Sequence, residues 1–189
     1  MKKTNVQFLT KTAMLLALTV VFQLIGTYLP KGVSNFVVGP LVNASLLIAT
    51  ALAGVWSGLF IALVAPFTSL LLNHIGVASV QFFFSPVIVI GNALFVLAFH
   101  LFRNKSKVGG IAVGTAVKFG VLYGGILGFY RLAEATGFSA TLGAGTPAYP
   151  VIKTALIAAF GYPQIITALL GGAIALAAIK LLDRQFKVR

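Results

Sequence analysis

The chain contains no cysteine and only two acidic residues, Glu134 and Asp183. Without cysteine it has no disulfide, no thiolate metal site and no cysteine nucleophile. Two acids and two histidines, His74 and His100, do not supply the carboxylate pairs, histidine-rich metal sites or activated nucleophiles of membrane-embedded hydrolases. We therefore expect no catalytic residues, no metal site and no enzymatic activity in this chain.

The features that energise transport are also missing. Proton- and sodium-coupled transporters generally hold Asp or Glu within a membrane span, and here neither acid falls within an apolar stretch. The chain also lacks the Gly-x-x-x-x-Gly-Lys-Ser/Thr loop that binds the phosphates of ATP. If this protein moves a solute uphill, another protein must supply the energy.

Apolar sequence, in contrast, is abundant. Hydrophobic residues make up 59% of the 189 residues, and they form about six stretches that can each cross a bilayer as a helix of roughly 20 residues. We predict an all-α integral membrane protein that forms a single domain over residues 1–189. The predicted spans are about 12–29, 36–53, 55–72, 82–102, 109–130 and 163–182, with a polar segment at about 73–81. Between the last two spans we expect a mobile loop, about 131–150, and a short interfacial helix, about 151–160.

The basic residues give the chain a formal net charge of +12 and are spread unevenly. With both termini in the cytoplasm, ten Lys and Arg lie inside and three, Lys31, Arg131 and Lys153, lie outside. The positive-inside rule favours this orientation, in which the 131–150 loop is an extracellular lid. Because the basic residues flank apolar spans, we expect them to contact lipid headgroups and do not expect nucleic acid as a partner.

Lys118 is the single charged residue in the interior of a predicted span. Such a charge is costly in lipid and usually faces protein or a polar cavity. It could lie at the floor of a cavity and attract an anionic solute, or its stem could snorkel to the inner interface. At about 100° per residue it borders a glycine-rich face that we expect to pack against neighbouring helices. This face comprises Gly110, Gly114, Gly124, Gly125 and Gly128.

Further polar and aromatic residues are candidates for ligand contacts, but each of them could instead have a purely structural role. Tyr123, Tyr130, Tyr149 and Tyr162, with Arg131 and Lys153, could bind a solute or form the aromatic and basic belt of a membrane interface. Asn43, Asn92 and Gln164 lie within spans and could bond a ligand or another helix. The same choice applies to Asn35, Gln81 and Phe84, which lie near outer helix ends.

Ala13 and Ala17 lie four residues apart on one face of the first predicted helix. This spacing lets another helix approach closely. With this Ala-x-x-x-Ala pattern, six spans, fewer than 200 residues and no ATP motif, the whole chain resembles the substrate-binding S component of energy-coupling factor (ECF) transporters, a vitamin-uptake branch of the ABC importers. Segments 39–44 and 91–93 are similar to bacterial members of this group.

The resemblance implies a multi-pass protein of the bacterial plasma membrane that binds a vitamin at its outer face. It also implies that Ala13 and Ala17 dock on a transmembrane coupling subunit, which two cytoplasmic ATPases drive with ATP and Mg²⁺; this chain itself needs no cofactor. The pocket of the family lies at the outer helix ends. With the polar residues within the spans, it gives the candidate substrate contacts Tyr28, Asn35, Gln81, Phe84, Asn92, Lys118, Tyr123, Tyr130, Arg131, Lys153, Tyr162 and Gln164.

The charges favour a substrate with a carboxylate or phosphate, since Lys118, Arg131 and Lys153 outnumber Glu134. We expect pantothenate first, with cobalamin, folate, riboflavin and a queuosine precursor as other candidates; the single tryptophan, Trp56, disfavours thiamine. A stand-alone channel or facilitator for small solutes is an alternative function. A scaffold or regulatory membrane subunit is another.

Overall fold

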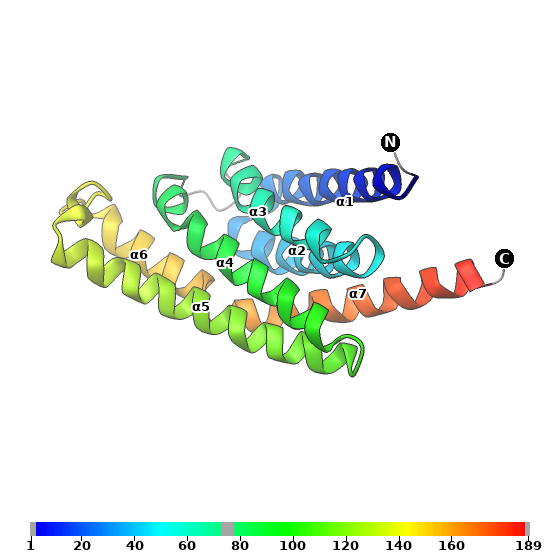
Figure 1. Cartoon of the computed structure of the whole chain (residues 1–189). Helices are drawn as coiled ribbons and strands as arrows, with labels where there is room; N and C mark the ends of the chain where they lie inside the picture. Colours follow the sequence, from blue (N-terminus) through cyan, green and yellow to red (C-terminus); the bar gives the residue numbers. More distant parts are fainter. Residues whose placement is uncertain (1–2, 73–77, 188–189) are drawn as a thin grey trace.

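The computed structural model describes residues 3–72 and 78–187, and this part of the chain is built of helices without any strand (Figure 1). The elements are α1 (Lys3–Thr27), α2 (Lys31–Leu52), α3 (Val55–Leu71), α4 (Ala78–Phe102), α5 (Lys107–Ala135), the 3₁₀ turn η1 (Phe138–Ala140), α6 (Ala148–Ala159) and α7 (Pro163–Lys187).

Five stretches of the described chain are long and apolar enough to cross a membrane: Val6–Thr27, Val33–Leu52, Val80–Phe102, Lys107–Ala135 and Ala148–Leu182. The shorter apolar helix α3 has 17 residues. These helices confirm the prediction of an all-α, multi-pass membrane protein. The last stretch covers both α6 and α7, and the turn at Gly161-Tyr162 separates the two helices as predicted.

Two predicted boundaries at the loops were wrong. Helix α5 continues to Ala135, so Arg131 is helical and does not open the predicted loop. Arg131 and Glu134 are exposed, and polar residues at a membrane surface lower the local hydropathy without ending a helix. Helix α4 begins at Ala78, inside the segment predicted as polar loop; residues 73–77 of that segment lie outside the described residues.

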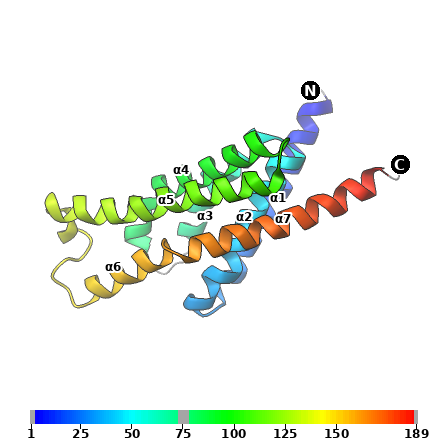
Figure 2. The same ribbon diagram turned by 90° about the horizontal axis from the view of Figure 1, so that it is seen from below.

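The first turn of α1 and the last turn of α7 lie at the same end of the bundle, here called the inner end (Figure 1). The opposite, outer end carries the connection from α1 to α2 and the segment from η1 to α6. Figure 2 shows α6 beyond the outer part of α7, on the side of α5. This arrangement agrees with an even number of crossings, and the cytoplasmic placement of the termini stays a prediction.

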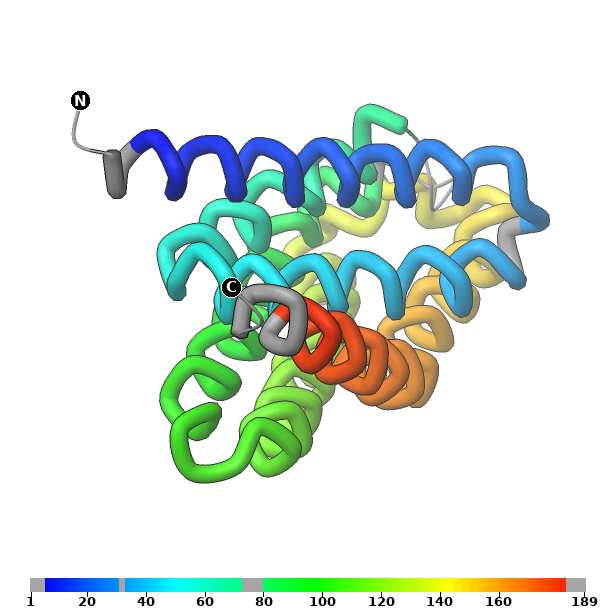
Figure 3. Tube along the Cα trace, turned by 90° about the vertical axis from the view of Figure 1, so that its right-hand side faces the viewer, coloured from blue at the N-terminus to red at the C-terminus, as the bar shows by residue number. Residues whose placement is uncertain are grey.

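Helix α2 lies at the centre of the fold, between α1 and α7 (Figure 3), and it also packs against α3 and α4. Helix α4 in turn joins α3 to α5. The inner core cluster centres on Leu46, Leu47, Phe95 and Phe99, from α2 and α4. A separate outer cluster of α4, α5 and α6 contains Phe84, Leu122, Ile126, Tyr130, Leu156 and Phe160.

Two cations hold the inner end of α2. Lys11 Nζ donates to the carbonyl of Leu52 at 3.3 Å, and Arg103 Nη1 donates to the carbonyl of Thr50 at 2.9 Å. The last carbonyls of a helix have no partner within it and carry partial negative charge, so basic side chains stabilise this end. Positive residues therefore fix α2 to α1 and to the connection between α4 and α5.

Glycines allow close contact at two helix pairs. A Cβ atom on Gly171 of α7 would lie 2.6 Å from the carbonyl oxygen of Pro40 in α2. On α5, Cβ atoms on Gly114 and Gly125 would approach Phe95 and Val87 of α4 to 2.8 and 2.5 Å. Gly124 and Gly128 have no such neighbour within 4 Å, so this part of the predicted glycine face was wrong. The glycines of this predicted face that are in close contact are those directed to α4.

Candidate functional site

An open cavity of about 740 Å³, including the solvent at its mouth, lies among helices α1 to α5 and α7 and the end of α6. The polar residues that line it are Gln23, Asn35, Asn43, Ser69, Gln81, Asn92, Lys118, Gln164 and Thr167. The apolar lining is Val38, Val42, Ala65, Pro66, Ile88, Leu122, Ala159, Phe160 and Pro163, and Gly39 completes the wall.

Positions along the helices give the cavity a deep end and an outer end. Asn43, Asn92 and Lys118 lie in the interiors of α2, α4 and α5, and we call them the floor. The mouth comprises Gln23, Asn35, Ser69 and Gln81, which lie close to the outer ends of their helices. Gln81 and Asn92 are eleven residues apart on α4, which corresponds to about 16 Å along the axis. The cavity is thus long enough for an extended small molecule.

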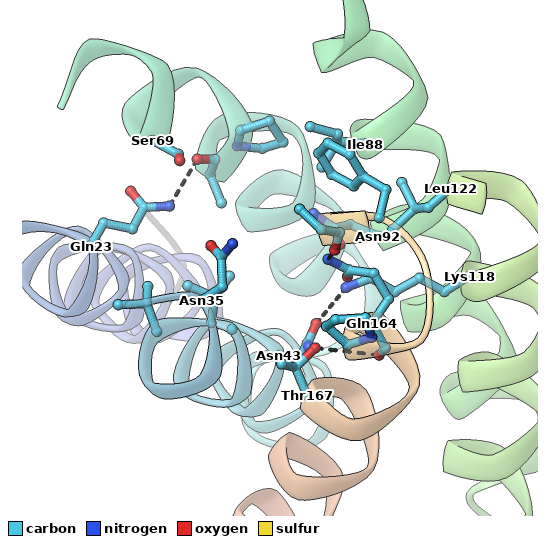
Figure 4. Close-up of a pocket in the computed structure, with 18 of the residues that line it drawn as sticks. Gln23, Asn35, Asn43, Ser69, Ile88, Asn92, Lys118, Leu122, Gln164 and Thr167 are labelled. Carbon is cyan, nitrogen blue, oxygen red and sulfur yellow. Dashed lines mark hydrogen bonds between the residues drawn. The ribbon is translucent and has the colours of Figure 1, made fainter. Parts of the chain in front are cut away.

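Lys118 is the centre of the floor. Its side chain is 4% exposed, and its Nζ donates to Oδ1 of Asn43 at 2.5 Å (Figure 4). The ammonium also lies 5.4 Å from the centroid of the Phe95 ring, a cation–π distance. The lysine is directed to the cavity and to a side-chain amide, and not to the inner surface as snorkelling would require. Of the two interpretations, this geometry favours a cation at the floor of a cavity.

None of the described residues that line this cavity is acidic. Glu134, the acid whose side chain the structure describes, pairs with Lys153 at 2.5 Å near the outer end of α5. Among the side chains that the structure describes, Lys118 therefore has an amide oxygen and an aromatic ring but no counter-ion. A buried cation without an anion is unfavourable, and an anionic ligand would offset this cost.

Six of the lining residues are carboxamides, and each can both donate and accept hydrogen bonds. Both polar atoms of the Gln23 carboxamide are bonded within the protein, because its Nε2 donates to the carbonyl of Ala65 at 2.9 Å and its Oε1 accepts from Thr68 at 2.7 Å. Gln164 Nε2 donates to the carbonyl of Ala159 at 3.1 Å. These bonds fix α1 to α3 and the start of α7 to α6, so two sides of the wall are held in place.

Five of the twelve predicted substrate contacts come together in this cavity: Asn35, Gln81, Asn92, Lys118 and Gln164. The structure places the other seven outside it. Phe84 and Tyr130 are buried in the outer core cluster. Tyr28 and Tyr162 are 83% and 77% exposed.

The remaining three lie on α5 and α6. Tyr123 stacks on Phe119 with ring centroids 5.4 Å apart, Arg131 is exposed, and Lys153 is held by Glu134. None of these three lines the cavity.

Gln23, Ser69 and Thr167 were not among the predicted contacts, and Asn43 was noted only as a polar residue within a span. Gln23 could have been found, because it is a carboxamide in an otherwise apolar stretch. Ser69 and Thr167 carry no such signal, since hydroxyls often bond the carbonyl one turn earlier in the same helix. Ala13 and Ala17, predicted to dock on a partner, have exposed side chains on α1.

No group of three or more His, Asp or Glu residues in the described part of the chain could hold a metal ion. The chemistry that the cavity offers is therefore recognition through one cation, several amides and two hydroxyls.

Comparison with known proteins gives one match. A family model described as "ECF transporter, substrate-specific component" matches residues 7–182. Searches of curated proteins and of solved structures found no match.

Proposed function

The chain belongs to the substrate-specific components of ECF transporters, and on this premise we propose that its cavity binds a small anionic vitamin, pantothenate first, for uptake driven by partner subunits. The observation that supports this proposal is the buried ammonium of Lys118 in a cavity whose described lining residues include no acidic side chain. A carboxylate on the substrate supplies the missing negative charge and makes a charge-assisted hydrogen bond there.

The rest of the lining favours a flexible, hydrogen-bonding substrate over a large ring system. Phe160 is the single aromatic side chain among the described lining residues, whereas the flat rings of riboflavin and folate are best bound by aromatic stacking. Pantothenate has a carboxylate, an amide and two hydroxyls but no ring, and these groups match one lysine and six carboxamides.

The partners of this proposal are a transmembrane coupling subunit and two cytoplasmic ATPases, in which ATP and Mg²⁺ act. Ala13 and Ala17 support such docking, because their side chains are exposed on α1 and leave room for a second helix to approach. In this assembly the chain recognises the vitamin and its partners hydrolyse ATP.

The experiment is calorimetric titration of the purified, vitamin-free protein with pantothenate and with panthenol, the neutral alcohol that has CH₂OH in place of the carboxylate. We expect panthenol to bind about 10- to 100-fold more weakly, because a hydrogen bond between two charged groups contributes about 1.5–3 kcal/mol. Equal affinities would show that the lysine does not recognise the carboxylate. If the protein binds another vitamin and not pantothenate, the choice of pantothenate is wrong and that vitamin is the substrate.

A further inference from the structure

Gln81, at the mouth of the cavity, carries a buried oxygen with no partner. The residue is 1% exposed, and its Oε1 accepts no hydrogen bond from any described residue. Its Nε2 donates to Ser69 Oγ at 3.3 Å, which is long for a hydrogen bond. Its backbone carbonyl accepts from Ser85 Oγ at 2.7 Å.

An unpaired buried acceptor is unfavourable and uncommon, so each one in a folded protein requires an explanation. Gln81 is not an ordinary core residue, because it lines the cavity together with Ser69. The carboxamides of Gln23 and Gln164 in the same wall make well-formed bonds within the protein. Among the described residues that line the cavity, Gln81 Oε1 is the side-chain atom that is fully buried without a hydrogen-bond partner.

The position of Gln81 relative to the floor restricts the ligand group that can use this oxygen. Asn92, at the floor beside Lys118, is eleven residues further along α4, or about 16 Å. A substrate whose carboxylate lies at Lys118 reaches Gln81 only with its opposite end. That end must donate a hydrogen bond, because a carboxamide oxygen is purely an acceptor.

We propose that Gln81 Oε1 accepts a hydrogen bond from a hydroxyl group at the end of the substrate remote from its carboxylate. The hydroxyl enters beside the pair formed by Ser69 and Gln81. Its hydrogen is donated to Gln81 Oε1 and its oxygen accepts from the Ser69 hydroxyl, while Gln81 Nε2 keeps its bond to Ser69 Oγ. Gln81 is thus a specificity-determining residue that selects hydroxylated carboxylates over carboxylates with an apolar end. This inference rests on the proposed function, because it takes Lys118 as the site of the carboxylate.

The test combines a variant with a ligand analogue. Gln81→Met removes the amide and keeps the length of the side chain, and terminally deoxygenated pantothenate has CH₃ in place of the terminal CH₂OH. We expect the wild-type protein to bind pantothenate about 5- to 100-fold more tightly than the deoxy analogue, and Gln81→Met to bind the two equally. Ser85→Ala is the matched control; it deletes a buried hydroxyl one turn along α4 that does not line the cavity, so the wild-type preference should persist.

A second measurement separates ligand recognition from a structural role. The vitamin-free Gln81→Met protein should melt at or above the temperature of the wild type, because the substitution removes an unpaired acceptor. A clearly lower melting temperature would show that Gln81 stabilises the fold and would overturn the proposal.

If Gln81→Met still prefers pantothenate over the deoxy analogue, the proposed role of Gln81 is overturned. The proposed function stays intact in that case, provided that the wild type binds pantothenate. If the wild type binds neither ligand, the choice of pantothenate is contradicted, and the melting temperature alone decides the role of Gln81.

Discussion

At the scale of single residues, the bond between Lys118 and Asn43 determines what the cavity can recognise. The two residues are 75 positions apart in the sequence and join α5 to α2. The amide oxygen of Asn43 partly solvates the ammonium but leaves its charge in place. The protein therefore holds a prepared cation whose charge is not neutralised by any described neighbour.

Asn43→Asp should neutralise the charge of Lys118 from within the protein. The new carboxylate would pair with Lys118 within the protein and repel the carboxylate of a ligand. We expect pantothenate affinity to fall at least about 100-fold, or about 3 kcal/mol, with no loss of melting temperature in the vitamin-free protein. Calorimetric titration and thermal unfolding check both expectations.

Asn43→Leu is the comparison for this variant, because it removes the amide without adding charge. It should weaken binding less than Asn43→Asp does. If both variants lose the same affinity, charge neutralisation at the floor is not the cause.

At the scale of elements, the floor depends on close packing between α2 and α7. Gly171→Ala places a Cβ atom 2.6 Å from both the carbonyl oxygen of Pro40 and the Cβ atom of Asn43. Backbone cannot give way as a flexible side chain can, so the two helices must separate. We expect a loss of about 1–3 kcal/mol in stability and weaker pantothenate binding, measured by thermal unfolding and titration.

The matched control is Gly124→Ala on α5, where a new Cβ atom meets no heavy atom within 4 Å. This variant should be neutral or gain up to about 1 kcal/mol from its higher helix propensity. A Gly171→Ala protein as stable as Gly124→Ala would contradict the close packing of α2 and α7.

Helix α1 has two faces with different tasks. Its buried face is polar, where Thr12 donates to Ser57 Oγ at 2.8 Å and Gln23 bonds α3. Its exposed face carries Ala13 and Ala17. We expect Ala17→Leu to abolish uptake by the assembled transporter while pantothenate affinity is unchanged, because a bulky side chain prevents close approach of a partner helix.

Leu18→Phe enlarges an exposed side chain about 100° around the same helix and should leave uptake intact. Transport assays with the complete complex, together with titration of the isolated chain, compare the two variants. Normal uptake by Ala17→Leu would remove the alanines from the docking surface.

At the scale of the whole molecule, the sequence was sufficient for the number and type of the helices. Burying apolar stretches in lipid requires helices, because every backbone group must find its partner within the segment. The ends of α4 and α5 could not be placed in the same way, since Ala78 to Gln81 and Arg131 to Ala135 are polar or interfacial and still helical. The low hydropathy of such residues predicts a loop, but their backbone continues the hydrogen-bonded helix.

The candidate site could be predicted in part for a related reason. Lys118 was found because a charge within a span is costly wherever it points. Tyr130 and Tyr162 carried an equally plain signal, but one is buried in the outer core cluster and the other is exposed to the surroundings. Which face of a helix meets a cavity depends on its neighbours, and one sequence read helix by helix does not contain that information.

The whole molecule should bind its vitamin alone and accumulate it only with partners. The purified chain in liposomes is expected to retain pantothenate affinity but to give no concentrative uptake, because it has no nucleotide motif and no acid in the interior of a span to couple an ion. Adding the coupling subunit, the two ATPases and ATP should give accumulation. Equilibration of pantothenate by the chain alone would instead indicate a facilitator.

The most direct measurement is a cycle of four dissociation constants, for wild-type and Lys118→Met protein with pantothenate and with panthenol. We predict that Lys118→Met loses about 10- to 100-fold in affinity for pantothenate, little for panthenol, and no longer distinguishes the two ligands. A Lys118→Met protein that still prefers pantothenate as strongly as the wild type does would contradict the central role of the buried lysine.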